Sequence, residues 1–224
     1  VMHDKRTVAG YTTRNSGGVP DNFKNWFIVR FDRKIRDFQI YDGTKPVEGE
    51  QLVGEHALVR VGFETRRGEQ VTVRAASSFI SQMQAVQNLE ELGKDDFETV
   101  KAKAQARWDE VLGRIEVEGG TTDQYRTFYS CLYRSTLFPR KFYEIDKNGN
   151  ILHYSPYNGE VLPGYMYTDT GFWDTFRSLF PLLNLVYPSV NAEIQAGLAN
   201  AYRESGFLPE WASPGHRGCM VGNN

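Results

Sequence analysis

The chain has 224 residues, of which 40% are hydrophobic and 24% charged, and its net charge at pH 7 is −2. This composition is typical of a globular protein with one large or two small domains, and the length is enough to bury a core without disulfides or metals. The near-neutral charge gives no electrostatic reason to expect nucleic acid as a partner, and no apolar run reaches the roughly 18–20 residues that cross a bilayer. We therefore expect a soluble protein, in which Cys131 and Cys219, outside any CxxC motif, are unpaired buried thiols.

The first third of the chain is expected to be all-β. Residues 26–31 are rich in β-branched and aromatic side chains. Residues 57–63 and 71–75 alternate apolar and polar positions, which indicates half-buried strands. Short strands joined by Gly-containing turns favour an antiparallel β-sandwich over residues 1–82, and we expect the beginning of this sandwich to be missing.

The apolar spacing then changes from two residues to three and four. Residues 83–92 have a helical pattern, and a single apolar stripe runs through residues 97–115. Asp95 and Asp96 lie where an N-cap and a first turn are expected, and a Gly-Gly pair follows the stripe. Residues 83–118 are therefore predicted to form a helical linker between two domains.

Residues 119–224 are predicted to begin a helical domain. A helix is expected over 121–137, a hairpin over 142–154, a helix from about 173 to near 188, and a helix from about 192 to 203. Repeated helices with long loops between them favour the first part of an α/α toroid. We expect the polypeptide to be truncated, because the remaining helices of such a toroid are absent from this sequence.

The common nucleotide, zinc-protease and serine-hydrolase motifs are missing, and one candidate metal loop is weak. Asp146, Asn148 and Asn150 place oxygen atoms at the first, third and fifth positions of a possible calcium loop. Such a loop needs Gly at the sixth position and Glu at the twelfth, where this chain has Ile151 and Tyr157. A hairpin turn explains the same residues.

The segment between residues 163 and 222 has the character of a binding site. Its aromatic, acidic and basic residues include Tyr165, Tyr167, Asp169, Trp173, Asp174, Arg177, Glu210, Trp211 and Arg217. Aromatic faces stack on the apolar face of a pyranose, while carboxylates and guanidinium groups bind its hydroxyls. Arg217 lies among glycines and prolines in a predicted loop, where ligand contact is easier to explain than a structural role. These residues suggest a domain that binds or processes carbohydrate.

Structural roles compete with this interpretation. Trp173 and Phe176 lie on the expected apolar face of one helix, which favours positions in the core. Asp174 and Arg177 are three residues apart, a spacing that also forms surface ion pairs. Asp169 precedes the predicted helix and is a candidate N-cap.

Several strings in this region resemble glycoside hydrolase family 92. The resemblance is carried by Tyr167–Arg177, Leu208–Trp211 and Gly215–Asn223, with Trp-Asp-Thr-Phe-Arg and Arg-Gly-Cys-Met as the most specific parts. Two further strings, Arg114–Gly120 and Phe128–Arg134, match the beginning of that family's catalytic domain. The resemblance extends more loosely to the strands before residue 82, and so covers most of the chain.

The resemblance implies an exo-acting α-mannosidase, often specific for α-1,2-linked mannose. The family joins an N-terminal β-sandwich to an (α/α)6 barrel through linker helices. It hydrolyses with inversion, which uses two carboxyl groups about 6.5–9.5 Å apart. It needs Ca2+, which binds hydroxyls two and three of the terminal mannose. The general acid Glu, the base Asp and the calcium ligands are expected beyond residue 224, so no catalytic or metal residue is assigned and the isolated chain is expected to be inactive.

By the same resemblance, Asp169 and Arg217 are the leading candidates to bind hydroxyls of the terminal mannose, and Tyr167 occupies an aromatic position of the same pocket. The remaining substrate-binding candidates, either as sugar contacts or as supports of the site, are Trp173, Asp174, Arg177, Glu210 and Trp211. The expected partners are a mannose-containing glycan and the missing remainder of the polypeptide, and the expected location is the periplasm or the cell surface. The alternatives are a glucoamylase or disaccharide phosphorylase type of enzyme, and a non-catalytic carbohydrate-binding module.

Overall fold

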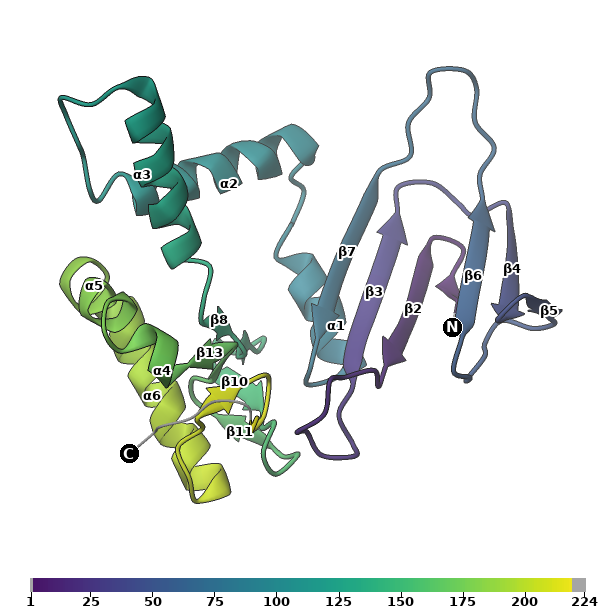
Figure 1. Cartoon of the computed structure of the whole chain (residues 1–224). Helices are drawn as coiled ribbons and strands as arrows, with labels where there is room; N and C mark the ends of the chain where they lie inside the picture. Colours follow the sequence, from purple (N-terminus) through teal and green to yellow (C-terminus); the bar gives the residue numbers. More distant parts are fainter. Residues whose placement is uncertain (1, 219–224) are drawn as a thin grey trace. The chain divides into compact units, whose positions relative to one another are not determined.

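The computed structural model of the protein describes residues 2–218, and the chain divides into two compact units (Figure 1). The β unit consists of Val1–Thr13 and Lys24–Gly93. The helical unit consists of Arg14–Phe23 and Lys94–Asn224. Within the described range, no helix is both long and apolar enough to cross a membrane.

The β unit contains two antiparallel sheets. The order of strands in the first sheet is β1 (Met2–Asp4), β2 (Thr7–Thr12), β3 (Asn25–Phe31) and β7 (Val73–Ser78). The order in the second sheet is β5 (Lys45–Val47), β4 (Asp37–Asp42) and β6 (Ala57–Gly62). The predicted fold class, an N-terminal antiparallel β region followed by helices, is confirmed.

The helix α1 (Gln82–Glu90) belongs to the β unit, because it packs on the first sheet. Its N-cap is Ser81, whose side chain accepts a hydrogen bond from the backbone of Gln84 at 3.0 Å. Ala85 and Leu89 lie four residues apart on one face of the helix and are buried against Ile28 of β3. This cluster is the core of the β unit.

Five helices lie in the described part of the helical unit. They are α2 (Phe97–Leu112), α3 (Thr122–Ser135), α4 (Phe172–Thr175), α5 (Leu179–Val186) and α6 (Pro188–Ser205). Asp96 caps α2 by accepting from the backbone of Thr99, and Thr121 forms a capping box with Gln124 at the start of α3. The predicted helices over 97–115 and 121–137 are therefore present, slightly shorter than expected.

The prediction of one helix from residue 173 to near residue 188 is wrong. The chain leaves helical geometry at Ser178, whose φ and ψ are −134° and −49°, and so forms α4 and α5 as separate helices. The next helix, α6, begins at Pro188 and not near residue 192. Proline suits this first position because its fixed φ is helical and its missing N–H has no partner there in any helix.

Short strands complete the described part of the helical unit. They are β8 (Arg140–Lys141), β9 (Glu144–Ile145), β10 (Ile151–Tyr154), β11 (Val161–Pro163), β12 (Tyr167–Thr168), β13 (Thr170–Gly171) and β14 (Trp211–Ala212). They form one sheet of order β11-β10-β9 and the two pairs β12-β8 and β13-β14.

The predicted hairpin over residues 142–154 is formed by β9 and β10. Asp146 Oδ1 accepts hydrogen bonds from the backbone N–H groups of Asn148 and Asn150, both at 2.8 Å, and Gly149 has a φ of 83°. The hydrogen bonds from the Asn150 side chain and backbone hold the pKa of Asp146 below its usual value. These oxygen-bearing residues therefore act as turn residues here.

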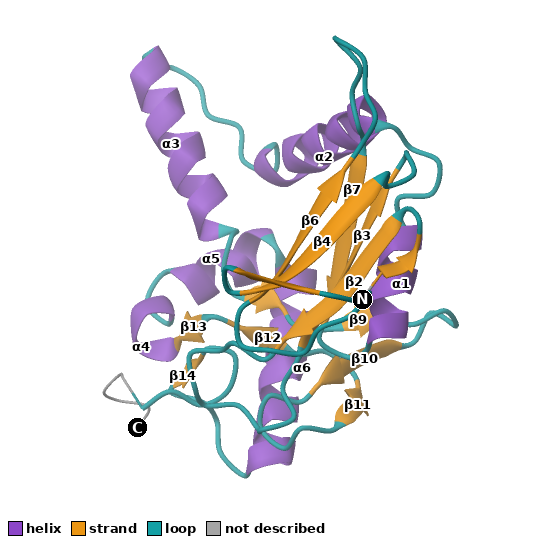
Figure 2. Ribbon diagram, turned by 90° about the vertical axis from the view of Figure 1, so that its right-hand side faces the viewer, coloured by secondary structure: helices purple, strands orange, loops and turns teal. Residues whose placement is uncertain are grey.

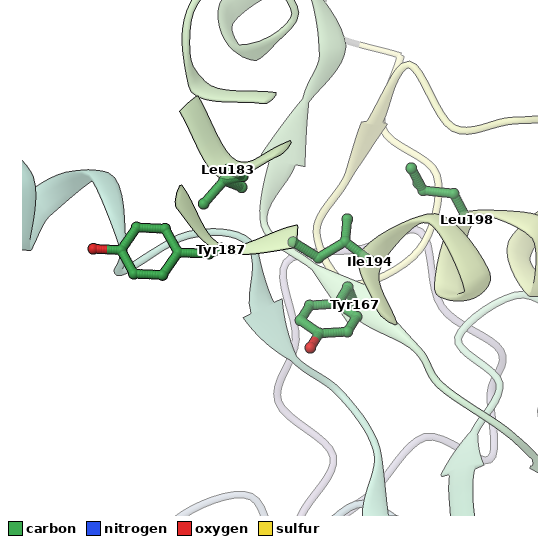
Figure 3. Packing of buried hydrophobic residues seen from close by; sticks show 5 residues of the cluster. All are labelled: Tyr167, Leu183, Tyr187, Ile194 and Leu198. Carbon is green, nitrogen blue, oxygen red and sulfur yellow. The ribbon is translucent and has the colours of Figure 1, made fainter. Parts of the chain in front are cut away.

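The core of the helical unit forms where β12 meets α5 and α6. Figure 3 shows the buried cluster, which comprises Tyr167, Leu183, Tyr187, Ile194 and Leu198. Gly197 of α6 allows this packing, because a Cβ there would lie 3.2 Å from the backbone nitrogen of Tyr167. Burial of each aliphatic side chain contributes about 1.5–3 kcal/mol.

The segment of residues 14–23, which follows β2 in the sequence, packs within the helical unit. Asn22 donates from Nδ2 to the carbonyl of Gly159 at 2.9 Å and accepts from the hydroxyl of Tyr154 at 2.9 Å. Gly18 lies so close to Gly215 that a Cβ on Gly215 would be 1.9 Å from the Gly18 carbonyl oxygen. Sequence periodicity contained no sign of these long-range contacts.

Cys131 is a free thiol, as expected, but it is exposed and not buried. It lies on α3, immediately before the buried Leu132. Cys219 lies outside the described residues, as do the last residues of the Gly215–Asn223 string.

Candidate functional site

Asp169 occupies the corner between two short strand pairs. It follows β12, which pairs with β8, and precedes β13, which pairs with β14. Figure 2 shows β13, β14 and α4 together in this part of the helical unit. The backbone N–H of Asp169 donates to the carbonyl of Ala212 at 2.8 Å, and its φ is 60°. The left-handed conformation costs most residues about 1–2 kcal/mol, although the short side chain of Asp tolerates it better than most.

Two side chains hold the Asp169 carboxylate. The guanidinium of Arg140 donates from Nε and Nη2 to Oδ2, and the hydroxyl of Ser213 donates to Oδ1 at 3.2 Å. The Asp169 side chain is only 17% exposed, whereas that of Arg140 is 64% exposed. Both carboxylate oxygens therefore have a fixed donor on the protein. The N-cap role expected for Asp169 is not observed, because Gly171 is the N-cap of α4.

Arg217 is connected to Asp169 through Ser213. Its Nε donates to the carbonyl of Ser213 at 3.4 Å, and its backbone N–H donates to the carbonyl of Trp211 at 2.9 Å. The loop between these residues folds back on itself, with the N–H of Ser213 donating to the carbonyl of Gly215 at 2.9 Å. The structure thus brings together the two leading candidates, which are 48 positions apart in the sequence, as the numbering shows.

Tyr167 lies in the core of the helical unit and is 4% exposed. Its hydroxyl donates to Glu193 Oε2 at 2.8 Å, and the hydroxyl of Tyr143 donates to the same atom at 3.0 Å. Burial, together with the nearby Glu193 carboxylate, raises the pKa of Tyr167 well above its usual value. Lys141 Nζ completes the group at 3.9 Å from Glu193. Tyr167 is thus a core residue whose hydroxyl is bound to Glu193.

Trp173 and Phe176 are not core residues, contrary to the helical pattern. Their side chains are 46% and 52% exposed. The guanidinium of Arg177 lies over both rings, at 4.6 and 4.4 Å from the ring centroids, and donates to the Trp173 carbonyl at 2.7 Å. Asp174 is exposed, and no ion pair joins it to Arg177 in the part of the chain that the structure describes. Both aromatic residues precede Ser178, where the chain leaves helical geometry.

Glu210 and Trp211 lie just before the loop of residues 213–217, which carries Ser213 and Arg217. The Glu210 side chain is exposed, and its carbonyl accepts from the backbone of Phe172 at 3.4 Å. The Trp211 ring covers Gly171, where a Cβ would lie 2.0 Å from the ring. Trp211 therefore fixes the β13-β14 pair, and a side chain on residue 171 would displace it.

The sequence contained no sign that Arg140, Ser213 and Glu193 belong to the candidate site. Arg140 lies in a Pro-Arg-Lys string that carries no motif, and only its pairing with β12 places it beside Asp169. Ser213 is one of many serines, and its role depends on the fold of the loop. Glu193 lies within a helix, where a carboxylate is usually solvated.

A separate cavity of about 340 Å³ lies in the β unit and contains none of the predicted site residues. Three arginines line it, and each guanidinium already donates to a protein oxygen. These pairs are Arg6 with the Asp32 carbonyl, Arg30 with Glu90, and Arg74 with the Gly93 carbonyl. Among residues 2–218, no group of three or more His, Cys, Asp or Glu side chains is arranged to hold a metal ion.

Both parts of the chain match one family of carbohydrate-active enzymes. Residues 1–78 match the N-terminal domain of glycosyl hydrolase family 92, and residues 84–224 match the catalytic domain of that family. These two matches together extend over nearly the whole chain. The chain therefore belongs to glycosyl hydrolase family 92.

Solved structures from Bacteroides thetaiotaomicron share this fold. One, a family GH92 inverting mannosidase, is 49% identical with a TM-score of 0.96 over 100% of this chain. Another, a family GH92 α-mannosidase in complex with mannoimidazole, is 28% identical with a TM-score of 0.83 over 99% of this chain. The present chain spans 30% of the length of each. The curated relative, described as an uncharacterized secreted glycosidase of Arthroderma benhamiae, is 40% identical over 77 residues, which are 32% of this chain and 10% of that protein.

Proposed function

We propose that the full-length protein containing this chain removes terminal α-linked mannose, preferentially α-1,2-linked, from glycans with inversion of configuration. The supporting observation is the 49% identity over the entire chain to a structure described as an inverting mannosidase. The juxtaposition of Asp169, Ser213 and Arg217 adds a chemical reason, because it combines an acceptor and a donor for sugar hydroxyls in one place.

In this proposal, Asp169 and Arg217 bind the terminal mannose. The Asp169 carboxylate has four lone-pair positions and uses only some of them on protein donors, so the others are available to sugar hydroxyls. The Arg217 guanidinium, which binds the Ser213 carbonyl, supplies hydrogen-bond donors for the sugar. Both groups act by binding and orienting the sugar ring, and we assign the roles of general acid and general base to no residue of this chain.

Ca2+ is part of the proposal for the full-length enzyme. The described residues do not fit a calcium site, because no suitable acidic cluster occurs among them. We therefore derive no step of the reaction through the metal, and we place its ligands outside the described residues. Export from the cytoplasm is likewise proposed, supported by the secreted fungal relative.

The experiment is an assay of mannose release from α-1,2-mannobiose by the full-length protein, first with Ca2+ and then with EDTA. We expect release that EDTA abolishes, with β-mannose as the first anomer seen by proton NMR. Release that persists in EDTA would remove calcium from the proposal. No release under either condition, from folded protein, would contradict the activity and favour another sugar or binding alone.

A further inference from the structure

Arg140 reaches Asp169 because of how β8 pairs with β12. Arg140 is the register partner of Thr168, the residue immediately before Asp169. Side chains alternate between the two faces of a strand. The two cationic side chains of β8, Arg140 and Lys141, therefore point in different directions. Arg140 binds Asp169, whereas its neighbour Lys141 approaches Glu193. Asp169 and Glu193 thus each have one cation from this strand.

The two donors on Asp169 come from separate elements and bind separate oxygens. Ser213 holds Oδ1 from the loop after β14, and Arg140 holds Oδ2 from β8. When both oxygens of the Asp169 carboxylate are held, rotation about its Cβ–Cγ bond is restricted. The remaining lone pairs then point in fixed directions. Removal of either donor frees this rotation.

We propose that Arg140 is a positioning residue that orients the Asp169 carboxylate for the terminal sugar. This inference rests on the proposed function, because it needs Asp169 to contact substrate. Arg140 acts through Asp169 and is assigned no contact with the reacting atoms. The pair also contributes to folding, because the Asp169 side chain is only 17% exposed although the guanidinium is 64% exposed, so the melting temperature of each variant is measured beside its kinetics.

The test is a double-mutant cycle in the full-length enzyme, with kcat and KM measured on α-1,2-mannobiose. We expect Arg140→Ala to lower kcat/KM by about tenfold and Asp169→Ala by about 100-fold or more. The double variant is expected to match Asp169→Ala, because Arg140 has nothing to orient once the carboxylate is gone. Arg140→Lys should retain part of the activity, because an ammonium still binds a carboxylate but lacks the planar fork of Arg.

Two controls separate positioning from folding. Arg126→Ala removes a similarly exposed arginine, paired with Asp123 on α3, and should leave kcat/KM and the melting temperature unchanged. If Asp169→Ala fails to fold because of its φ of 60°, Asp169→Gly replaces it in the cycle, since Gly adopts this conformation freely.

The outcomes distinguish this inference from the proposed function. Wild-type kinetics for Arg140→Ala, alongside a large loss for Asp169→Ala, would overturn the positioning role alone. Losses that multiply in the double variant would also overturn it, because Arg140 would then act independently of Asp169. Wild-type kinetics for Asp169→Ala would remove Asp169 from the site and overturn both.

Discussion

Ser213 donates a hydrogen bond from its hydroxyl to Asp169 Oδ1 at 3.2 Å, and the carbonyl of the same serine accepts from Arg217 Nε at 3.4 Å. One residue thus connects the two groups proposed to bind the sugar. Ser213 therefore bridges the Asp169 carboxylate and the Arg217 guanidinium.

Replacement of Ser213 by Ala is expected to lower kcat/KM of the full-length enzyme by about tenfold. Hydrogen bonds to a charged group contribute about 1.5–3 kcal/mol, and the loss of this one frees one side of the Asp169 carboxylate. Steady-state kinetics on α-1,2-mannobiose measures the effect. Ser135→Ala is the control, because that hydroxyl binds only the Cys131 carbonyl within α3. Equal kinetics for the two variants would show that Ser213 is not needed.

Loss of Arg217 is expected to be more severe. Arg217→Ala removes the guanidinium that is proposed to donate hydrogen bonds to the sugar. It should lower kcat/KM by about 100-fold or more, which is roughly 3 kcal/mol of transition-state binding. The measurement is again steady-state kinetics of the full-length enzyme, with circular dichroism to verify folding. A folded variant with unchanged kinetics would exclude Arg217 from the sugar-binding group.

The close approach of Gly215 to Gly18 makes Gly215 intolerant of a side chain. A Cβ on Gly215 would lie 1.9 Å from the Gly18 carbonyl oxygen and 2.7 Å from that of Pro156, and backbone atoms cannot move aside easily. Gly215→Ala should therefore destabilise the protein by about 1–3 kcal/mol and reduce activity by displacing the loop of Arg217. Gly54→Ala is the control, because a Cβ there would meet Asp42 only at ordinary contact distances of 3.4 Å or more. The melting temperature and the activity of both variants test this prediction. Equal stability of the two variants would contradict the close approach of Gly215 to Gly18.

His153 and Glu204 form a buried pair in the helical unit. His153 is fully buried, with Nδ1 2.8 Å from the Gly164 carbonyl oxygen and Nε2 2.9 Å from Glu204 Oε1. Glu204→Ala leaves His153 Nε2 without its hydrogen-bond partner, and an unsatisfied buried polar group typically costs about 1–3 kcal/mol. We expect a clear fall in melting temperature, compared with Glu118→Ala at an exposed position. An unchanged melting temperature would show that the pair contributes nothing.

Alkaline pH should weaken the core around Tyr167. Burial and Glu193 raise the pKa of Tyr167 above its unfolded value of 10.0, so the folded state holds this proton more tightly than the unfolded chain. The stability from this shift is fully present below pH 10 and is lost as the pH rises above that value. Thermal unfolding between pH 8 and pH 11 should show a steeper alkaline loss for the wild type than for Tyr167→Phe. Parallel curves would exclude Tyr167 as the cause.

Most helices and strands were predictable from the sequence, because they depend on local patterns. Alternation within the strands and three- and four-residue spacing within the helices are properties of neighbouring residues, and Asp96 and Thr121 are caps that act over one turn. The break at Ser178 was missed because an apolar helical pattern continues across it. The exposure of Trp173 was missed because the helical pattern places this residue on the apolar face.

The candidate site was predictable only in part. Motif resemblance indicated Asp169 and Arg217, since both lie in specific strings. Arg140, Ser213 and the docking of Gly18 depend on pairing between segments that are far apart in the sequence. No local pattern encodes the left-handed conformation of Asp169, which exists because two strand pairs meet at that residue.

The claim that Asp169 binds the terminal mannose is tested most directly by the kcat/KM of the full-length Asp169→Gly enzyme on α-1,2-mannobiose. Gly keeps the backbone conformation that residue 169 needs and removes the side chain with its carboxylate. We predict a fall of about 100-fold or more with little change in melting temperature. Wild-type kinetics from this folded variant would contradict the claim.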